Sequence, residues 1–286
     1  MLAILWAAAA SFVVLAAMFG PLERLFPARP GQRVFRPAWL TDGAFFLGQY
    51  LLFNLVAIWG LIRLTQLIGP GAVVRSPWWA PPAVIAGDLL VYGFHRACHR
   101  FTFLWRFHAV HHSSEHLDWL AAHREHPVDG LLTQLAQNLP AVLLGVAPET
   151  LASLAVFRGV WAIFVHSNVR LPLGPLRWLV GAPELHHWHH ARSSTTERTT
   201  HNFANLAPWI DLLFGTHHLP DDATYPLGLS QPWPRAYLAQ LAQPFVELAH
   251  ATRRRLMKQH SRSAAHYTRA HEDPVRVRAG AGGRLQ

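Results

Sequence analysis

The distribution of apolar positions along the chain predicts an all-α protein built on membrane helices. Residues Leu2–Gly20 and Gly43–Ile62 are uncharged apolar stretches, and Trp78–Phe94 is a third apolar segment. A helix of about 20 apolar residues is long enough to cross a bilayer. We therefore expect about three membrane spans. A cleaved signal peptide is the alternative for the first stretch, although the chain lacks the positively charged start of such peptides.

Two further apolar stretches predict a helical hairpin. Leu131–Ala147 and Leu151–Val165 are separated by only three residues, Pro148 to Thr150. Both stretches are short for a complete span, so we expect them to enter the bilayer and return on the same side.

The basic residues predict the orientation of this helical bundle. Arg24, Arg29, Arg33 and Arg36 lie between the first two predicted spans, and the positive-inside rule places this loop in the cytoplasm. The third span then ends on the cytoplasmic face, and the returning hairpin keeps the following residues there. We expect a multi-pass protein with four regions. These are N-terminal membrane helices in 1–79, a histidine-rich domain in 80–220, an amphipathic segment in 221–250 and a basic, mostly disordered tail in 251–286.

The composition agrees with a membrane protein. Hydrophobic residues make up 51% of the chain and charged residues only 14%, below the roughly 25% that is usual in soluble domains. The single cysteine, Cys98, excludes an internal disulfide and any metal site built from several cysteines. Much of the net charge of +9 lies in the tail, where it would attract anionic lipid. No recognition motif supports binding to nucleic acid.

Three histidine motifs carry the candidate chemistry. They read His95-Arg-Ala-Cys-His99, His108-Ala-Val-His111-His112 and His186-His187-Trp-His189-His190. Imidazole ligands suit iron, zinc, copper or nickel better than magnesium or calcium. Leaving out His187, the eight histidines exceed the needs of one ion, so we expect two ions. His126 and His166 are candidates for additional ligands. Without a bridging carboxylate, the ions should lie farther apart than the roughly 4 Å of common two-metal sites.

A helical stripe leads into the first motif. Asp88, Tyr92, His95 and His99 follow the spacing of residues on one helical face. We expect Asp88 or Tyr92 to orient a ligating imidazole through its second nitrogen. A buried ion pair between Asp88 and an arginine is the alternative.

These motifs resemble the fatty acid hydroxylase/sterol desaturase superfamily over roughly residues 80–220. The resemblance rests on the following runs, in the order found in the family: Asp88-x3-Tyr92-x2-His95-Arg-x2-His99, Leu104-Trp-Arg-Phe-His108-x2-His111-His112-Ser113, His126-Pro127, His166-Ser-Asn168-Val169, Pro183-Glu-Leu-His186-His187-Trp-His189-His190, Asn202-Phe-Ala-Asn205-Leu206 and Phe214-Gly-Thr216. The Trp-Asp pair of the family is split here as Trp209-Ile-Asp211, which leaves the role of that aspartate open.

The resemblance implies a membrane enzyme with a histidine-bound di-iron centre on the cytoplasmic face. The histidines would hold two Fe ions, for which Zn may substitute, and O2 would be the co-substrate. Such enzymes use O2 and two electrons to hydroxylate or desaturate a lipid. This chain has no dinucleotide or flavin motif. A separate electron donor of the ferredoxin or cytochrome b5 type, with its reductase, is therefore expected. We hypothesise that it docks near Arg96, Arg100 and Arg106.

Several alternatives stay open at the level of sequence. A zinc-dependent membrane hydrolase and a histidine-rich metal-binding or transport protein would both use such motifs. The apolar segments do not distinguish a sterol, a fatty acyl chain, an isoprenoid such as a carotenoid, or an alkylglycerol as the substrate. Hydroxylation and desaturation are equally compatible with the motifs, because the outcome depends on the placement of a second C–H bond.

Overall fold

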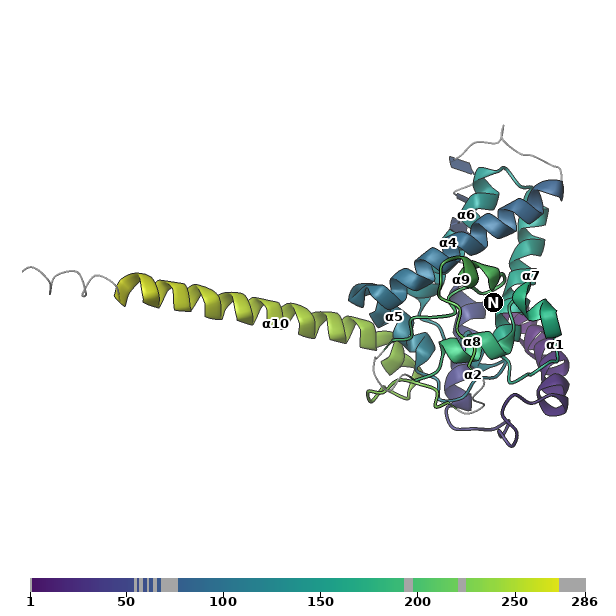
Figure 1. Ribbon diagram of the computed structural model, residues 1–286, viewed down its shortest axis with the longest axis horizontal. Coiled ribbons are helices and arrows are strands. Elements are labelled where there is room, and N and C mark those ends of the chain that lie inside the picture. The colour runs from purple at the N-terminus through teal and green to yellow at the C-terminus, as the bar shows by residue number, and fades with distance from the viewer. Residues whose placement is uncertain are drawn as a thin grey trace, which may run out of the picture. The chain divides into compact units, whose positions relative to one another are not determined.

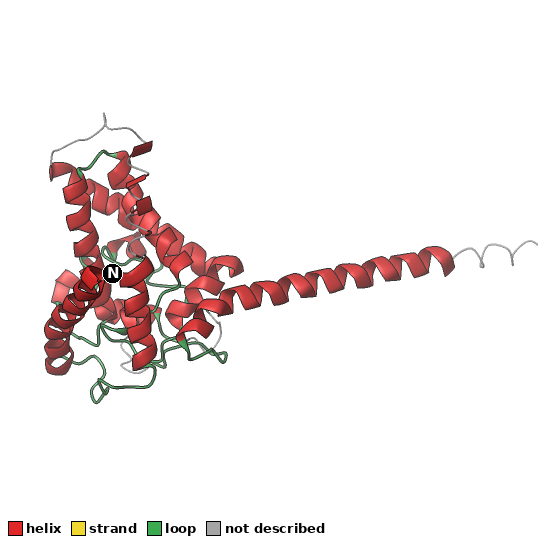
Figure 2. Cartoon of the chain, turned by 180° about the vertical axis from the view of Figure 1, so that it is seen from behind, coloured by secondary structure: helices red, strands yellow, loops and turns green. Residues whose placement is uncertain are grey.

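The fold is known from a computed structural model, which describes residues 2–53, 77–192, 198–220 and 225–272 and isolated positions between 56 and 67 (Figure 1). Within these residues the chain is helical and has no strand beyond isolated bridges (Figure 2). The all-α prediction is confirmed for this part of the chain. The main helices are α1 (Leu2–Leu25), α2 (Trp39–Gly48), α4 (Ala80–Arg100), α5 (Thr102–His112), α6 (Pro127–Leu143), α7 (Pro148–His166), α8 (Pro183–His189), α9 (Trp209–Leu213) and α10 (Tyr237–Glu272).

Two helices among the described residues are long and apolar enough to cross a membrane, Leu2–Leu25 and Glu149–His166. The first contains the predicted span Leu2–Gly20. The second is one arm of the predicted hairpin, whose other arm is α6. The number of spans and the cytoplasmic orientation stay predictions.

The other two predicted spans have different outcomes. The segment predicted from Trp78 to Phe94 is helical as α4, but α4 is not one of the two candidate spans. The physical reason is its polar stripe, since Asp88 and the residues from His95 onward lower its hydropathy. The segment Gly43–Ile62 begins in α2 and continues as a π-helical turn over Gln49–Phe53. Most of its remainder lies outside the described residues.

The chain forms two compact units, Met1–Leu241 and Ala242–Gln286, and all three histidine motifs belong to the first. The tail predicted to be disordered from residue 251 is helical in the structure as far as Glu272, within α10. The expectation of disorder is therefore wrong for 251–272. This stretch is rich in alanine, arginine and other residues of high helix propensity, which outweighs its low apolar content. Residues 273–286 lie outside the described part.

The helices of the first unit pack closely around α4, which contacts α5, α6 and α7 (Figure 1). Gly87 in α4 permits this approach, because a Cβ atom there would collide with the Gln137 carbonyl of α6. Arg158 of α7 reaches into the same place and donates hydrogen bonds to the Gln137 carbonyl at 2.8 Å and the Val84 carbonyl at 2.5 Å. The buried guanidinium therefore ties three helices together.

A buried ion-pair network joins the N-terminal region to the histidine-rich domain. Arg36 pairs with Asp42 at 2.8 Å and with Asp118 at 2.6 Å, and Arg124 pairs with Asp42 at 2.6 Å. Asp42 is completely shielded from solvent. Breaking such a buried pair leaves an uncompensated charge, which is strongly destabilising. Arg36, one of the arginines of the predicted cytoplasmic loop, thus has a structural role.

Gly181 offers a test of the packing near the histidines. Its amide donates to the Leu206 carbonyl at 2.7 Å, and a Cβ atom at this position would overlap the Asn205 carbonyl. We expect Gly181→Ala to lower the free energy of unfolding by about 1–3 kcal/mol, the usual cost of overpacking. Thermal melting in detergent measures this. Gly159→Ala in α7, where no atom lies within 4 Å, is the control and should be neutral or slightly stabilising. Equal melting of both variants would contradict the expected overlap.

Candidate metal centre

The structure brings nine of the ten predicted ligand histidines into two groups. The five-histidine group consists of His95, His99, His108, His112 and His189, and the four-histidine group consists of His111, His166, His186 and His190. Within each group, one nitrogen atom of every member lies within 4.8 Å of the others. The two groups adjoin each other, since the rings of His112 and His190 stack with centroids 4.4 Å apart.

Helical geometry explains how one motif serves both groups. Residues four apart on a helix differ by about 40° in direction, whereas residues three apart differ by about 60° the other way. His108 and His112 of α5 therefore point into one group, and His111 points into the other. In the same manner α8 and the residue after it place His186 and His190 in the four-histidine group and His189 in the five-histidine group.

The Nδ1 atoms of six histidines are fixed by acceptors that carry no proton. Five face backbone carbonyls and one faces a carboxylate: His95 to Phe203 at 2.8 Å, His99 to Thr199 at 3.1 Å, His111 to Arg124 at 3.0 Å, His166 to Ala162 at 2.6 Å, His189 to His201 at 2.8 Å and His108 to Asp129 at 2.8 Å. A neutral imidazole that donates from Nδ1 has a lone pair on Nε2. These six side chains are therefore oriented as metal ligands through Nε2.

The Nε2 atoms converge at distances that fit a bound cation. The Nε2 atom of His166 lies 3.0 Å from that of His111 and 2.9 Å from that of His186. The Nε2 atoms of His189 and His112 are 3.1 Å apart. Ligand nitrogens about 2.0–2.1 Å from one metal lie roughly 2.9–3.4 Å from each other. Since His111 and His166 both donate from Nδ1, two lone pairs face each other at 3.0 Å. Two facing lone pairs repel each other, and a cation bound by both nitrogens would remove this repulsion.

Burial keeps these ligands in the form that binds metals. It lowers the pKa of His95 to about 3 and that of His111 to about 4. Desolvation likewise lowers the pKa of His189 well below its usual value. These three imidazoles are therefore neutral at physiological pH, as a metal ligand must be. The Nε2 atoms of His95 and His99 are buried without a hydrogen-bond partner, which again fits a ligand position.

The predicted stripe on α4 is present, but Asp88 and Tyr92 do not contact an imidazole. The Asp88 carboxylate accepts from the backbone amides of Leu206 at 3.3 Å and Ala207 at 2.8 Å. The Tyr92 hydroxyl lies 2.9 Å from the hydroxyl of Thr216. The expectation that one of them orients a ligand through its second nitrogen is corrected. Backbone carbonyls of residues 199–203 take this part for His95 and His99.

Asp129 is a candidate functional residue that sequence reasoning missed. It lies in the first turn of α6 and is buried, with one oxygen 2.8 Å from His108 Nδ1 and the other 3.7 Å from the Cys98 thiol. The nearby histidines lower the pKa of its carboxyl against the opposing effect of burial. A carboxylate on the far nitrogen of a ligand histidine fixes the ring and raises its basicity. The run from His126 to Gly130 contained the signal, an acid just after a candidate ligand.

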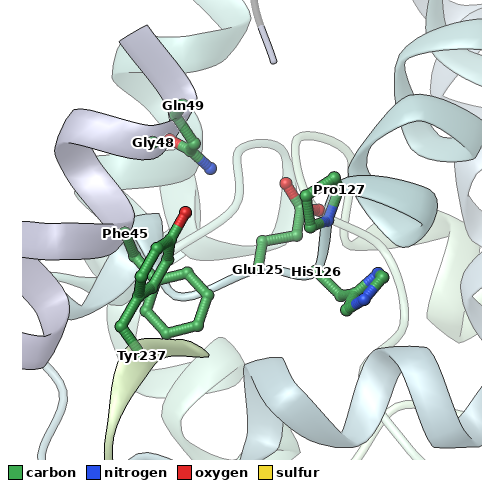
Figure 3. Close-up of a pocket in the computed structure, with 7 residues that line it drawn as sticks. All are labelled: Phe45, Gly48, Gln49, Glu125, His126, Pro127 and Tyr237. Carbon is green, nitrogen blue, oxygen red and sulfur yellow. The ribbon is translucent and has the colours of Figure 1, made fainter. Parts of the chain in front are cut away.

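His126 itself lies outside both groups, so its place in the predicted ligand set is corrected. Its Nδ1 accepts from the Val128 amide at 3.1 Å and so caps α6, while Nε2 lies 3.1 Å from the Leu241 carbonyl. Both ring nitrogens of His126 thus have hydrogen-bond partners, and the ring caps the start of α6. His126 lines a small pocket in which it and Glu125 lie across from Phe45 and Tyr237 (Figure 3). His187, which was left out of the predicted ligand set, contacts the Ser167 carbonyl at 3.0 Å.

A comparison with protein families shows which family the region around this centre resembles. The family described as Fatty acid hydroxylase matches residues 81–216, which contain all nine histidines of the two groups. The match covers a little under half of the chain, and this region is similar to the fatty acid hydroxylase family. The resemblance expected from the motifs is therefore confirmed. Asp88, Tyr92 and Asp211 also lie within this fatty acid hydroxylase domain.

Curated relatives agree with this assignment. The chain is 32% identical to the ornithine lipid hydroxylase OlsE of Rhizobium tropici over 57% of its own length and 49% of that protein. It is 29% identical to alkylglycerol monooxygenase of Danio rerio over 56% of its length and 36% of the relative. A putative Delta(7)-sterol-C5(6)-desaturase of Arabidopsis thaliana is 27% identical over 46% of each chain. The chain thus spans about half or less of these relatives. No solved structure gives a significant match.

Proposed function

We propose that this protein is a membrane-bound di-iron oxygenase that hydroxylates or desaturates a lipid with O2 and two external electrons. The proposal is carried by the two adjoining all-histidine groups inside the fatty acid hydroxylase domain. Imidazole sets suit iron among other transition metals. The names of the relatives (lipid hydroxylase, monooxygenase and sterol desaturase) favour oxidation of a lipid over the other chemistries of such a centre.

Under this proposal each group holds one ion. Bound iron would supply the activation of O2 for attack on an unactivated C–H bond. The chain itself keeps imidazoles such as His95, His111 and His189 neutral through burial, directs Nε2 atoms toward the centre and limits access of water. Neither group contains a carboxylate among its described members. Asp129 forms a further cluster with Cys98 and His108, and its carboxylate is hydrogen-bonded to His108 Nδ1. A hydrolase would need an additional general base.

The electrons would come from a separate carrier, a ferredoxin or a cytochrome b5-type protein with its reductase. We place its docking surface near Arg96, Arg100 and Arg106, on the cytoplasmic face of a multi-pass protein. Charge reversal at Arg100, which is exposed at the end of α4, should raise the apparent KM for an acidic carrier. An unchanged KM would contradict this docking surface.

The function is tested on protein purified in detergent under anaerobic conditions. The expected result is about two irons per chain and O2-dependent oxidation of a lipid in the presence of a reductant. With ¹⁸O2, a hydroxylase transfers label to the lipid, whereas a desaturase forms an unlabelled alkene. Zinc alone, with no O2 consumption under any reductant, would contradict the oxygenase and favour the hydrolase or the metal-binding protein.

A further inference from the structure

One short segment contacts three of the five ligands in a single group. The backbone carbonyls of Thr199, His201 and Phe203 face the Nδ1 atoms of His99, His189 and His95 at 2.8–3.1 Å. These are alternate residues of one loop segment. All three ligands belong to the five-histidine group. In the four-histidine group, His111 and His166 face carbonyls of other elements, those of Arg124 and Ala162.

This segment is held in place by side chains that do not touch a ligand imidazole. Asp211 accepts from the amides of Phe203 at 2.8 Å and Ala204 at 2.9 Å, and from the hydroxyl of Thr216 at 2.7 Å. The carboxylate is buried, so these hydrogen bonds are shielded from water. Asp211 is the residue left without a role by the split Trp-Asp pair, and its bonds fix the orientation of the Phe203 peptide.

Asn202 fixes the turn between the last two carbonyls. Its φ of 56° lies in the left-handed region, which asparagine tolerates better than most residues. Its side chain donates to the Leu185 carbonyl at 2.9 Å and the His218 carbonyl at 2.6 Å, and accepts from the His218 amide at 2.8 Å. Asn202 thus joins the segment to the beginning of α8, the helix that contains His189.

We propose that Asp211 and Asn202 are positioning residues that hold the carbonyls of residues 199–203 against His95, His99 and His189, and thereby determine metal binding at the five-histidine group but not at the four-histidine group. The inference rests on the proposed function only in assuming that each group binds a metal. Outer partners of ligand histidines contribute roughly 10–100-fold to metal affinity in known sites. A change that disturbs three ligands of one group should therefore weaken the binding of one ion and leave the binding of the other unchanged.

The test uses the full-length protein in detergent, stripped of metal and titrated with Co(II), whose visible spectrum reports its ligand geometry. The wild type should bind about two Co(II) per chain. In Asp211→Asn an amide NH2 replaces one acceptor oxygen, so one of the two backbone amides loses its partner. We expect one Co(II) to bind as in the wild type and the other to bind at least about ten-fold more weakly. Asn202→Gly, which retains the left-handed backbone but removes the side-chain bonds, should weaken the same ion.

Two combinations identify the affected group. His189→Ala added to Asp211→Asn should remove no further strong site, because both changes act on one group. His166→Ala added to Asp211→Asn should remove the remaining strong site. Asp118→Asn is the matched control, since Asp118 is also a buried aspartate that accepts from two backbone amides, those of Leu120 and Ala121, but does not contact the segment. It should lower the melting temperature and leave the binding of the ion at the five-histidine group unchanged.

Two strong sites in Asp211→Asn and Asn202→Gly, or an equal weakening of both ions, would overturn the positioning role. This readout does not depend on turnover. A wild type that binds two metals but oxidises no lipid would contradict the proposed function and leave the Co(II) comparison decisive.

Discussion

His189→Ala is expected to abolish lipid oxidation and to remove the metal from the five-histidine group. His189 is completely buried, its Nε2 lies 3.1 Å from that of His112, and its Nδ1 is fixed by the His201 carbonyl. Loss of an outer partner alone weakens known sites roughly 10–100-fold, so loss of the ligand should lower turnover by more than about a hundred-fold. His111→Ala should have the same effect on activity by emptying the other group. Metal analysis and O2-dependent formation of the oxidised lipid, whether alcohol or alkene, measure both results.

The neighbouring His187 provides a matched control for this prediction. It belongs to the same helix and is equally buried, but it contacts the Ser167 carbonyl rather than the centre. His187→Ala should lower the melting temperature and retain the metal content of the wild type. If His187→Ala and His189→Ala lost metal to the same extent, a general disturbance of α8 rather than ligand loss would explain both.

Removal of the metals is expected to destabilise the fold markedly. In the stripped protein the Nε2 lone pairs of His111 and His166 would face each other at 3.0 Å, and those of His95 and His99 would be buried without a partner. An unsatisfied buried polar group costs about 1–3 kcal/mol. A metal present at a thousand times its Kd stabilises the folded state by about 4 kcal/mol per site. Chelation should therefore lower the melting temperature by several degrees, and Fe(II) or Zn(II) should restore it.

The double variant His111→Ala, His189→Ala separates this effect from damage by the chelator. With one ligand removed from each group, its melting temperature should no longer respond to chelation or reloading. A wild-type protein that melts at the same temperature with and without metal would contradict the assignment of the two groups as metal sites.

Much of the candidate site is predictable because ligand chemistry is local in the sequence. The three motifs and His166 supply the nine histidines, and helical spacing places pairs such as His186 and His190 on one side of a short helix. The same reasoning wrongly includes His126 among the ligands, although it lies outside both groups. A histidine before a proline at a helix start is also suited to cap that helix, and the accepted hydrogen bond from Val128 decided its place.

The residues that support the ligands were not predictable in the same way. Asp88 and Tyr92 share a face with His95, which is why the sequence predicts contact with an imidazole. The structure instead pairs Asp88 and Tyr92 with a segment more than 100 residues later in the chain. Asp129 is missed for the converse reason, since its partner His108 lies on a different helix.

The sequence by itself determined the similarity to the fatty acid hydroxylase family, the helical character of the described residues and nine candidate ligand histidines, because these depend on residue type and short-range spacing. Only the tertiary structure decided how the ligands divide. Each group combines histidines from distant motifs, and His108 and His112 separate from His111 because helix packing directs the two sides of α5 to different neighbours. The tertiary structure also decided which acceptors fix the rings. Backbone carbonyls carry no residue identity, so no motif encodes the contacts of Thr199, His201 and Phe203 with the centre.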